Sequence, residues 1–252
     1  MPVVRNNNLA GLNVIMLKVD LHIHSIASGH AYATIYEIIM EAKRKQMEMI
    51  AITDHGFVDP EDPMNNHFLM GSRKPDTGDL EFLWGAEANL LNEMGKTDLP
   101  EKALERLDLV SIGLHIFPKT DMGRDGNTRG LMKALENPKV KILAHPTQGA
   151  VPCDAGKVME KAVAEDVLLE LNLSKLANVE RKGQGSLNEF KQIVDLVKDK
   201  GKKLIVGSDA HFLHEIGDDS VLKKHWGELG LEEELIINNY PGELRDFLGL
   251  KE

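Results

Sequence analysis

The sequence has a single cysteine, few aromatic residues and fewer basic than acidic side chains. Cys153 has no partner within the chain, which excludes an intramolecular disulfide and with it the small secreted domains that disulfides hold together. Forty Asp and Glu residues against thirty Lys and Arg residues give a formal net charge of -10. A field of that sign repels nucleic acid and anionic membrane surfaces, so neither is expected as a partner.

Long hydrophobic runs are also missing. The apolar stretch 9–17 is interrupted by Gly11 and Asn13, which argues against a signal peptide. No stretch reaches the ~18 apolar residues of a transmembrane helix, so a cytoplasmic location is predicted. With 42% hydrophobic and 28% charged residues the composition is that of a globular protein, and the length of 252 residues suits one α/β barrel. We therefore expect a single domain over 1–252.

Short, β-branched apolar runs alternate with amphipathic segments, a pattern that predicts parallel strands with crossover helices. The predicted strands are 14–21, 49–53, 82–86, 109–114, 140–144, 167–172 and 203–207. The i, i+3, i+4 spacing of helices recurs at 36–45, 130–136, 157–164 and 187–200, with Thr34, Thr128 and Ser186 as expected N-caps.

The remaining segments are predicted as loops and short helices. Two long loops are expected at 56–78 and 119–130, and the second is rich in Gly, Asp and Arg. The stretch 218–248 is predicted to form two short helices, with Pro241 and Gly242 at the turn between them. Gly183 and Gly185 are expected in a further turn.

Side chains that can bind metals gather at the carboxyl ends of the predicted strands. In chain order they are His22, His24, Asp54, His55, Glu87, His115, His145, Glu170, Asn172, Asp209 and His211, and His30 lies in a turn after the first strand. Parallel strands of a barrel share one carboxyl-terminal face, where barrel enzymes hold their active sites. The side chains should therefore converge on one mouth.

The mixture of residue types predicts a polynuclear metal site. Neutral imidazoles suit zinc, iron or manganese, and carboxylates neutralise the charge and can bridge two ions. The candidate ligands are His22, His24, His30, His55, Glu87, His115, His145, Asp209 and His211. Nine donors are too many for one ion that keeps open positions for water and substrate, so two or three divalent ions are expected.

Several short motifs give the chain a resemblance to a known family. They are Val19-Asp-Leu-His-Ile-His-Ser, His30-Ala-Tyr, Ala51-Ile-Thr-Asp-His-Gly, Glu87-Ala-Asn89, His145-Pro146, Glu170-Leu-Asn172, Arg181-Lys-Gly183 and Ser208-Asp209-Ala-His211. The set, spread over residues 18–212, resembles the PHP (polymerase and histidinol phosphatase) family, and within it the YcdX-like phosphatases. The resemblance implies a distorted, TIM-like (β/α)7 barrel with three bound divalent metal ions. Zinc is the expected metal, and manganese and iron are the alternatives.

The resemblance also implies how the ligands are divided. One metal would take His22, His24, Glu87 and Asp209, a second Glu87, His115 and His145, and a third His30, His55 and His211. Glu87 would then bridge two ions.

The predicted activity is hydrolysis of a small phosphomonoester by a metal-activated water, held by Glu87, Asp209 and His211. Arg181, His67 and Asn172 are candidate substrate contacts, although Leu173 to Lys175 are less polar than the family's usual run and leave those contacts open. Asp54 is a candidate to orient a ligand imidazole, with a plain turn cap as the alternative.

Two other functions fit parts of the pattern. A metal-dependent amidohydrolase also begins with His-x-His and ends with Asp, but it does not need His30, His55 and His211. A non-catalytic regulatory metal module is the second alternative. Arg124 and Arg129 are weaker anion-binding candidates, and His214 and His225 are expected at the surface or in packing. The sequence leaves the substrate and the oligomeric state open.

Overall fold

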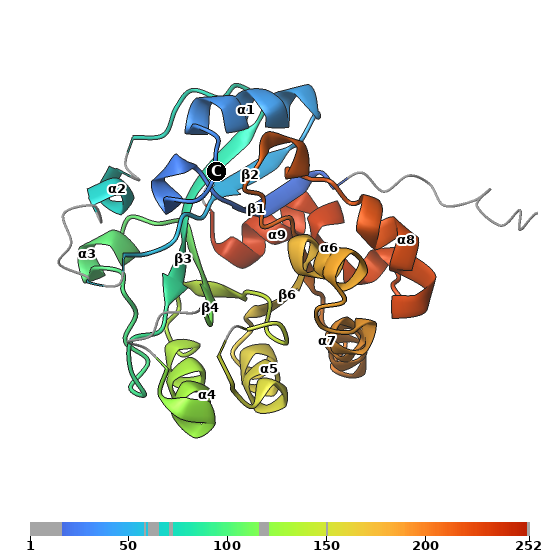
Figure 1. Cartoon of the computed structure of the whole chain (residues 1–252). Coiled ribbons are helices and arrows are strands. Elements are labelled where there is room, and N and C mark those ends of the chain that lie inside the picture. The colour runs from blue at the N-terminus through green and yellow to red at the C-terminus, as the bar shows by residue number, and fades with distance from the viewer. Residues whose placement is uncertain are drawn as a thin grey trace, which may run out of the picture.

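The computed structural model describes residues 17–57, 59, 66–70, 73–115, 121–149 and 151–250. Its seven strands are β1 (Val19–Ile23), β2 (Met49–Ile52), β3 (Glu81–Asn89), β4 (Leu109–Gly113), β5 (Val140–Leu143), β6 (Leu168–Asn172) and β7 (Ile205–Gly207). They follow one another in sequence order, and every neighbouring pair is parallel. Helices surround the sheet (Figure 1).

The sheet curls until its two outer strands meet. Past the end of β7, Ala210 pairs in parallel with Ile23, and the Ala210 carbonyl accepts the amide of His24 at 2.9 Å. The buried carboxylate of Asp20 on β1 accepts the amide of Ser208 at 3.2 Å across the same junction. These contacts close a distorted, TIM-like (β/α)7 barrel, which confirms the predicted fold class.

The amino-terminal half of this junction is closed by a side chain. Asn238 is fully buried, and its amide group donates to the carbonyls of Val19 on β1 (2.9 Å) and Val206 on β7 (2.8 Å). Its oxygen accepts the Val206 amide at 2.8 Å. One asparagine thus replaces the ladder hydrogen bonds that β1 and β7 do not make with each other.

The helices are α1 (Ile35–Arg44), α2 (Asn66–Leu69), α3 (Glu101–Leu104), α4 (Gly123–Ala134), α5 (Ala155–Ala164), α6 (Leu173–Lys182), α7 (Leu187–Asp199), α8 (Ser220–Leu229) and α9 (Pro241–Leu248). Short 3-10 turns are η1 (Ile26–Ser28), η4 (Leu213–Glu215), η5 (Glu233–Leu235) and η6 (Ile237–Asn239). None of the helices in the described ranges is long and apolar enough to cross a membrane.

The barrel interior is apolar at one end and polar at the other. Val19, Leu21 and Leu109 belong to a buried cluster inside the barrel, and Leu244 and Leu248 of α9 pack against it. A second, larger core lies between the strands and the surrounding helices. The carboxyl-terminal end of the interior is instead filled by buried histidines and carboxylates.

Most predicted elements are confirmed with ends shifted by a few residues, and the Thr34 cap is confirmed with a full capping box with Glu37. Ser186 occupies its predicted N-cap position without a side-chain cap bond. The predicted first strand begins outside the described residues, because 14–16 lie there, and the observed strand extends to Ile23. In the predicted loop 56–78, the described residues include the short helix α2.

The prediction of a loop at 119–130 is wrong in its described part, because α4 begins at Gly123. Thr128 consequently does not cap a helix: it lies inside α4, and its hydroxyl donates to the Arg124 carbonyl at 2.7 Å. The glycines misled the prediction. A Cβ at Gly130 would lie 2.7 Å from the Asn92 carbonyl oxygen, so glycine is used here for close helix packing and not for a turn.

Two further differences come from caps. Helix α6 was not predicted, although Asn172 caps it by accepting the Lys175 amide at 3.0 Å and Gly183 ends it in a left-handed conformation. Pro241 and Gly242 begin α9 instead of forming a turn, in agreement with the preference of proline for the first turn of a helix. Two helices, α8 and α9, do occupy the predicted C-terminal stretch.

Replacing Asn238 with Ala should lower the free energy of unfolding by about 2–4 kcal/mol, because three buried backbone groups lose their partners. Urea unfolding measures the change. Asn239→Ala is the matched control, since Asn239 makes a single long bond of 3.4 Å, and it should change the stability by less than about 0.5 kcal/mol. Equal stability of the two variants would contradict the role given to Asn238.

Candidate metal centre

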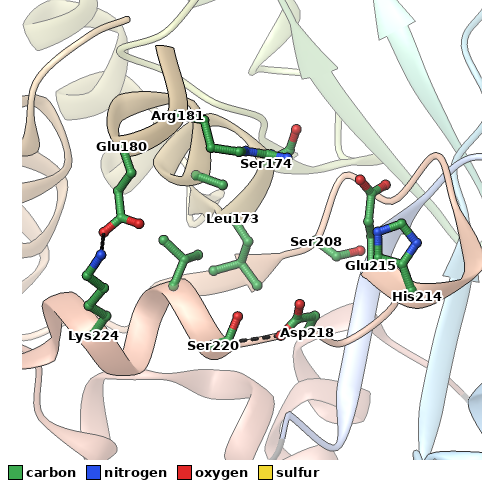
Figure 2. A pocket seen from close by; sticks show the side chains of 12 residues that line it. Leu173, Ser174, Glu180, Arg181, Ser208, His214, Glu215, Asp218, Ser220 and Lys224 are labelled. Atoms are coloured by element: carbon green, nitrogen blue, oxygen red, sulfur yellow. Dashed lines mark hydrogen bonds and ion pairs between the residues drawn. The ribbon is translucent and has the colours of Figure 1, made fainter. Parts of the chain in front are cut away.

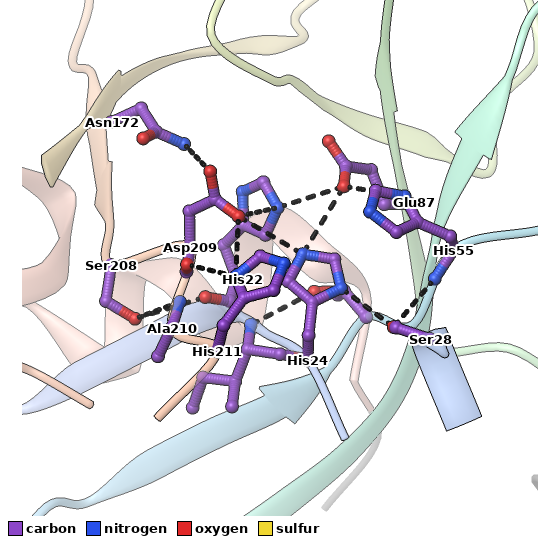
Figure 3. A network of polar contacts seen from close by, with 12 residues as sticks. His22, His24, Ser28, His55, Glu87, Asn172, Ser208, Asp209, Ala210 and His211 are labelled. Atoms are coloured by element: carbon purple, nitrogen blue, oxygen red, sulfur yellow. Dashed lines mark hydrogen bonds and ion pairs between the residues drawn. The ribbon is translucent and has the colours of Figure 1, made fainter. Parts of the chain in front are cut away.

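Nine side chains meet at the carboxyl-terminal mouth of the barrel, and they come from every strand end except that of β6 and from the turn after β1. The set, called the nine-residue cluster below, consists of His22, His24, His30, His55, Glu87, His115, His145, Asp209 and His211. All nine were predicted, eight of them from positions at strand ends and His30 from a turn after the first strand. In Figure 3 the labelled side chains of His22, His24, His55, Glu87, Asp209 and His211 are directed toward one another.

Glu87 is the centre of the cluster. It lies on β3, it is buried, and five imidazoles surround its carboxylate. The nitrogen–oxygen distances are 2.9 Å from His145, 3.0 Å from His115, 3.2 Å from His22 and His55, and 3.4 Å from His24. One carboxylate oxygen faces His115 and His145, and the other faces the remaining three. Glu87 therefore joins two halves of the cluster.

Asp209 is the second carboxylate. Its Oδ1 lies 3.3 Å from His24 Nε2, 3.7 Å from His22 Nε2 and 3.6 Å from His211 Nδ1. The outer rim is formed by His30 and His211, whose Nε2 atoms are 2.8 Å apart. The ring of His55 stacks on that of His30 with the centroids 5.1 Å apart.

Several donor atoms of the cluster are buried without a hydrogen-bond partner among the described residues: His22 Nε2, His24 Nε2, His55 Nδ1, His145 Nδ1 and Glu87 Oε2. Leaving such atoms unsatisfied is costly unless something else binds them. Imidazole nitrogens and carboxylate oxygens are ligands for divalent zinc, manganese or iron. The donor set fits such ions.

Three overlapping groups in the cluster have ligand atoms that lie within 4.8 Å of one another. They are His24, His55 and His211; His22, His24 and Asp209; and His55, Glu87 and His115. The pairings of His22 with His24 and Asp209, of Glu87 with His115, and of His55 with His211 coincide with the predicted division. His24 and His55 each belong to two groups, so the geometry alone leaves the division a prediction.

Burial and charge decide the protonation of these groups. Burial opposes a charge on His55 and lowers its pKa to about 2. Burial also opposes a charge on His22, but Glu170, Glu87 and Asp209 outweigh it and hold the His22 pKa well above its usual value. The surrounding imidazoles overcome burial at Glu87, so that the pKa of this carboxyl lies well below its ordinary range. The carboxylate stays ionised, as a metal ligand must.

Residues outside the cluster fix the orientation of its rings. The Nδ1 atom of His22 lies 2.6 Å from Glu170, and that of His115 lies 2.7 Å from the side-chain oxygen of Asn89. His24 Nδ1 lies 3.0 Å from the Ser28 hydroxyl. Such contacts select which ring nitrogen is left for a ligand. Glu170 and Asn89 lie within the sequence motifs, but no role in the site was predicted for either.

Asp54 touches the cluster through Ser28. It accepts the Ser28 hydroxyl at 2.6 Å, and the same hydroxyl oxygen contacts His24 and accepts the His55 amide. Burial opposes its ionisation, but hydrogen bonds from His67 and Ser28 lower the Asp54 pKa to about 2. In the described residues the Asp54 side chain therefore contacts the imidazole of His24 only indirectly, through the Ser28 hydroxyl.

The backbone is strained at two cluster residues. Asp209 has φ = 55° and His145 has φ = 31°, in the left-handed region that L residues with a side chain seldom adopt. His145 also precedes a proline, which disfavours helical conformations further. The main chain is also closely packed here, because a Cβ added at Gly207 would clash with Glu170 Oε1. Backbone strain of this kind is concentrated at functional sites.

The three predicted substrate contacts lie in different places. Asn172 is buried, and its amide donates to Glu170 at 3.0 Å and Asp209 at 3.3 Å, so in this structure it positions carboxylates. His67 lies against Asp54, with its Nε2 2.9 Å from the carboxylate. Arg181 lies on α6 and lines a cavity of about 400 Å³ between α6, α8 and η4 (Figure 2).

The two arginines and two histidines for which weaker or no site roles were predicted lie as follows. Arg124 and Arg129 form exposed ion pairs with Asp154 and Glu93. His225 lies 2.6 Å from Glu180, which agrees with a packing role. His214 lines the same cavity as Arg181.

Lys175 is a candidate that sequence reasoning missed. It lies in the first turn of α6, and its Nζ is 3.6 Å from Asp209 Oδ2, with the side chain 32% exposed. A cation is thus placed at the rim of the cluster. The signal was available, because Lys175 comes three residues after the strand-end residue Asn172, but it required α6 to be predicted.

The chain is similar to known proteins over most of its length. A family model described as the PHP domain matches residues 20–241. A protein named "probable phosphatase" from Caldanaerobacter subterraneus subsp. tengcongensis is 36% identical over 95% of this chain and 94% of its own. Another from Citrobacter koseri is 34% identical over 92% and 94%.

A solved structure has a similar fold. It is the histidinol phosphate phosphatase of Lactococcus lactis, complexed with zinc, L-histidinol and phosphate. It matches 86% of this chain and 95% of its own with a TM-score of 0.55 and 14% identity. At that identity the likeness supports the fold alone.

Metal content should fall as the pH is lowered from 8 to 5. Ligation requires neutral imidazoles, and the raised pKa of His22 means that a proton competes with the metal at this position, more strongly at lower pH. The metal per chain is measured by mass spectrometry after equilibration at each pH. An unchanged content over this range would argue against ligation by the histidines.

Proposed function

Because the chain belongs to the PHP domain family, we propose that it is a metal-dependent phosphatase that hydrolyses a small phosphomonoester at the nine-residue cluster. The observation that carries the proposal is the convergence of seven imidazoles and two carboxylates, several with buried donor atoms that lack hydrogen-bond partners. The names of the relatives support the reaction type.

Three divalent ions, with zinc as the preferred metal, are proposed to occupy the cluster. The first would be held by His22, His24, Glu87 and Asp209, the second by Glu87, His115 and His145, and the third by His30, His55 and His211. Such ions supply Lewis acidity for the phosphoryl oxygens and lower the pKa of a bound water toward 7. Glu87, Asp209 and His211 are the residues proposed to position that water.

The residues of the chain prepare the site for this chemistry. Glu170, Asn89 and Ser28 hold the rings of His22, His115 and His24, so that their Nε2 atoms face the carboxylates. Because these partners are themselves buried or hydrogen-bonded, little reorganisation is needed when a charged ligand enters. The carboxylates in turn reduce the positive charge that several divalent ions would otherwise concentrate there.

Lys175 is proposed to bind the phosphoryl group. Its ammonium group lies next to Asp209, is partly exposed, and can turn toward an anion at the mouth. Arg181, which lines the neighbouring cavity, is proposed to contact the rest of the substrate. Asn172 and His67 would act indirectly, through Asp209 and Asp54.

The two alternative functions have less support. An amidohydrolase does not need His30, His55 and His211. In this structure the ring of His30 contacts the rings of His55 and His211, so the three form one group at the site. A non-catalytic module is disfavoured because the full donor set is present and the match spans 94% of a relative named a probable phosphatase.

Asp209→Ala should abolish phosphate release from a simple aryl phosphomonoester assayed with added Mn²⁺ or Zn²⁺. The variant removes a carboxylate that contacts His22 and His24, so bound metal should fall as well. Asp195→Ala is the control, because Asp195 forms an exposed pair with Lys191 on α7. Wild-type turnover and metal content in Asp209→Ala would refute the site.

Lys175→Met should raise KM for the same ester by about tenfold, since it removes a charge-assisted contact to the phosphoryl oxygens. Lys175→Arg should recover part of the loss, and Lys191→Met should behave as wild type. A KM unchanged in Lys175→Met would mean that the lysine does not contact the substrate.

A further inference from the structure

Two exposed aromatic rings stack on each other at the rim of the nine-residue cluster. Tyr32 is 70% exposed and Phe212 is 46% exposed. Their ring centroids are 4.6 Å apart, and the ring planes are inclined by 15°. The pair contributes little to the core, because so much of its apolar surface remains in water.

The backbone ties this pair to the cluster. Exposed and buried residues alternate from His30 to Thr34, so His30 and Tyr32 lie on the same outward side of an extended segment. The Tyr32 amide donates to the carbonyl of His211 at 3.0 Å, and Phe212 is the next residue. Each ring therefore follows an outer imidazole of the cluster by one or two residues.

Further backbone hydrogen bonds hold the two rings in place without a ligand. The amides of His211 and Phe212 both donate to Glu215, at 2.9 and 3.0 Å. Together with the Tyr32 amide, this fixes the main chain on both sides of the ring pair. A stacked pair in a fixed position can bind a third planar ring at little cost in conformational entropy.

We propose that Tyr32 and Phe212 form a stacking surface for the leaving group of the substrate, and that the preferred substrates are phosphomonoesters with an aromatic or heteroaromatic group. The inference rests on the proposed phosphatase function. The phosphoryl group would lie at the cluster while the planar group extends the ring stack at the rim. Both residues determine specificity and do not touch the reacting atoms.

Tyr36 provides a matched control. It is 71% exposed and lies four residues away on α1. No ring contact involving Tyr36 is found among the described residues, whereas Tyr32 stacks on Phe212. A difference between Tyr32→Ala and Tyr36→Ala would therefore report on the stacked pair and not on the loss of any exposed tyrosine.

The first test compares KM for 1-naphthyl phosphate and glycerol phosphate, each referred to its wild-type value so that intrinsic reactivity cancels. Tyr32→Ala should raise KM for the naphthyl ester about three- to tenfold with kcat unchanged, and should change KM for glycerol phosphate less than twofold. Tyr32→Phe, which retains the ring, should keep the wild-type KM, and Tyr36→Ala should affect neither ester. Metal content should be equal in all variants.

The second test does not depend on turnover. Binding of phenylphosphonate and ethylphosphonate to the metal-loaded protein is measured by calorimetry, because neither compound has an ester bond to break. Tyr32→Ala should weaken only the phenyl compound, by a similar factor. Equal effects on both compounds, or no effect, would overturn the stacking surface. A wild-type protein that binds the phosphonates selectively but hydrolyses neither ester would instead refute the phosphatase function.

Discussion

The contact between the buried Glu87 carboxylate and five imidazoles is the interaction on which the rest of the structure depends. A carboxylate and several ring nitrogens without partners would be costly in the interior of a protein, so they must be compensated by one another and by bound cations. The five rings come from the ends of four strands, β1, β2, β4 and β5, that are distant in sequence. Only a closed barrel with fixed strand ends can bring them to one carboxylate.

The contacts that close the barrel between β1 and β7 also keep the cluster together. Asn238 and Asp20 join β1 to the β7 side, and His22 and Asp209 lie on the two sides of that junction. Any opening would separate the two residues that share a predicted metal. The apolar residues packed by α9 lie at the opposite end of the barrel. The barrel therefore has an apolar, packed end and a polar end that includes the strained backbone of Asp209 and His145.

The sequence was sufficient for the strands and for the nine-residue cluster, because β-branched runs and strand-end histidines are local patterns. It was insufficient where a residue acts through contacts that are distant in the chain. The glycines of α4 indicate a loop until the packing of Gly130 against Asn92 is known. Asn172 is polar and lies at a strand end, but its amide is used by Glu170 and Asp209, which sequence spacing cannot reveal. Lys175 was hidden because α6 was not predicted.

The most direct test of the account is to locate the bound ions themselves. A crystal structure of the metal-loaded protein, with anomalous scattering measured at the zinc and manganese absorption edges, would count and place them. The account predicts three ions inside the nine-residue cluster, with Glu87 contacting two of them. A single ion, or ions bound away from Glu87, would contradict it.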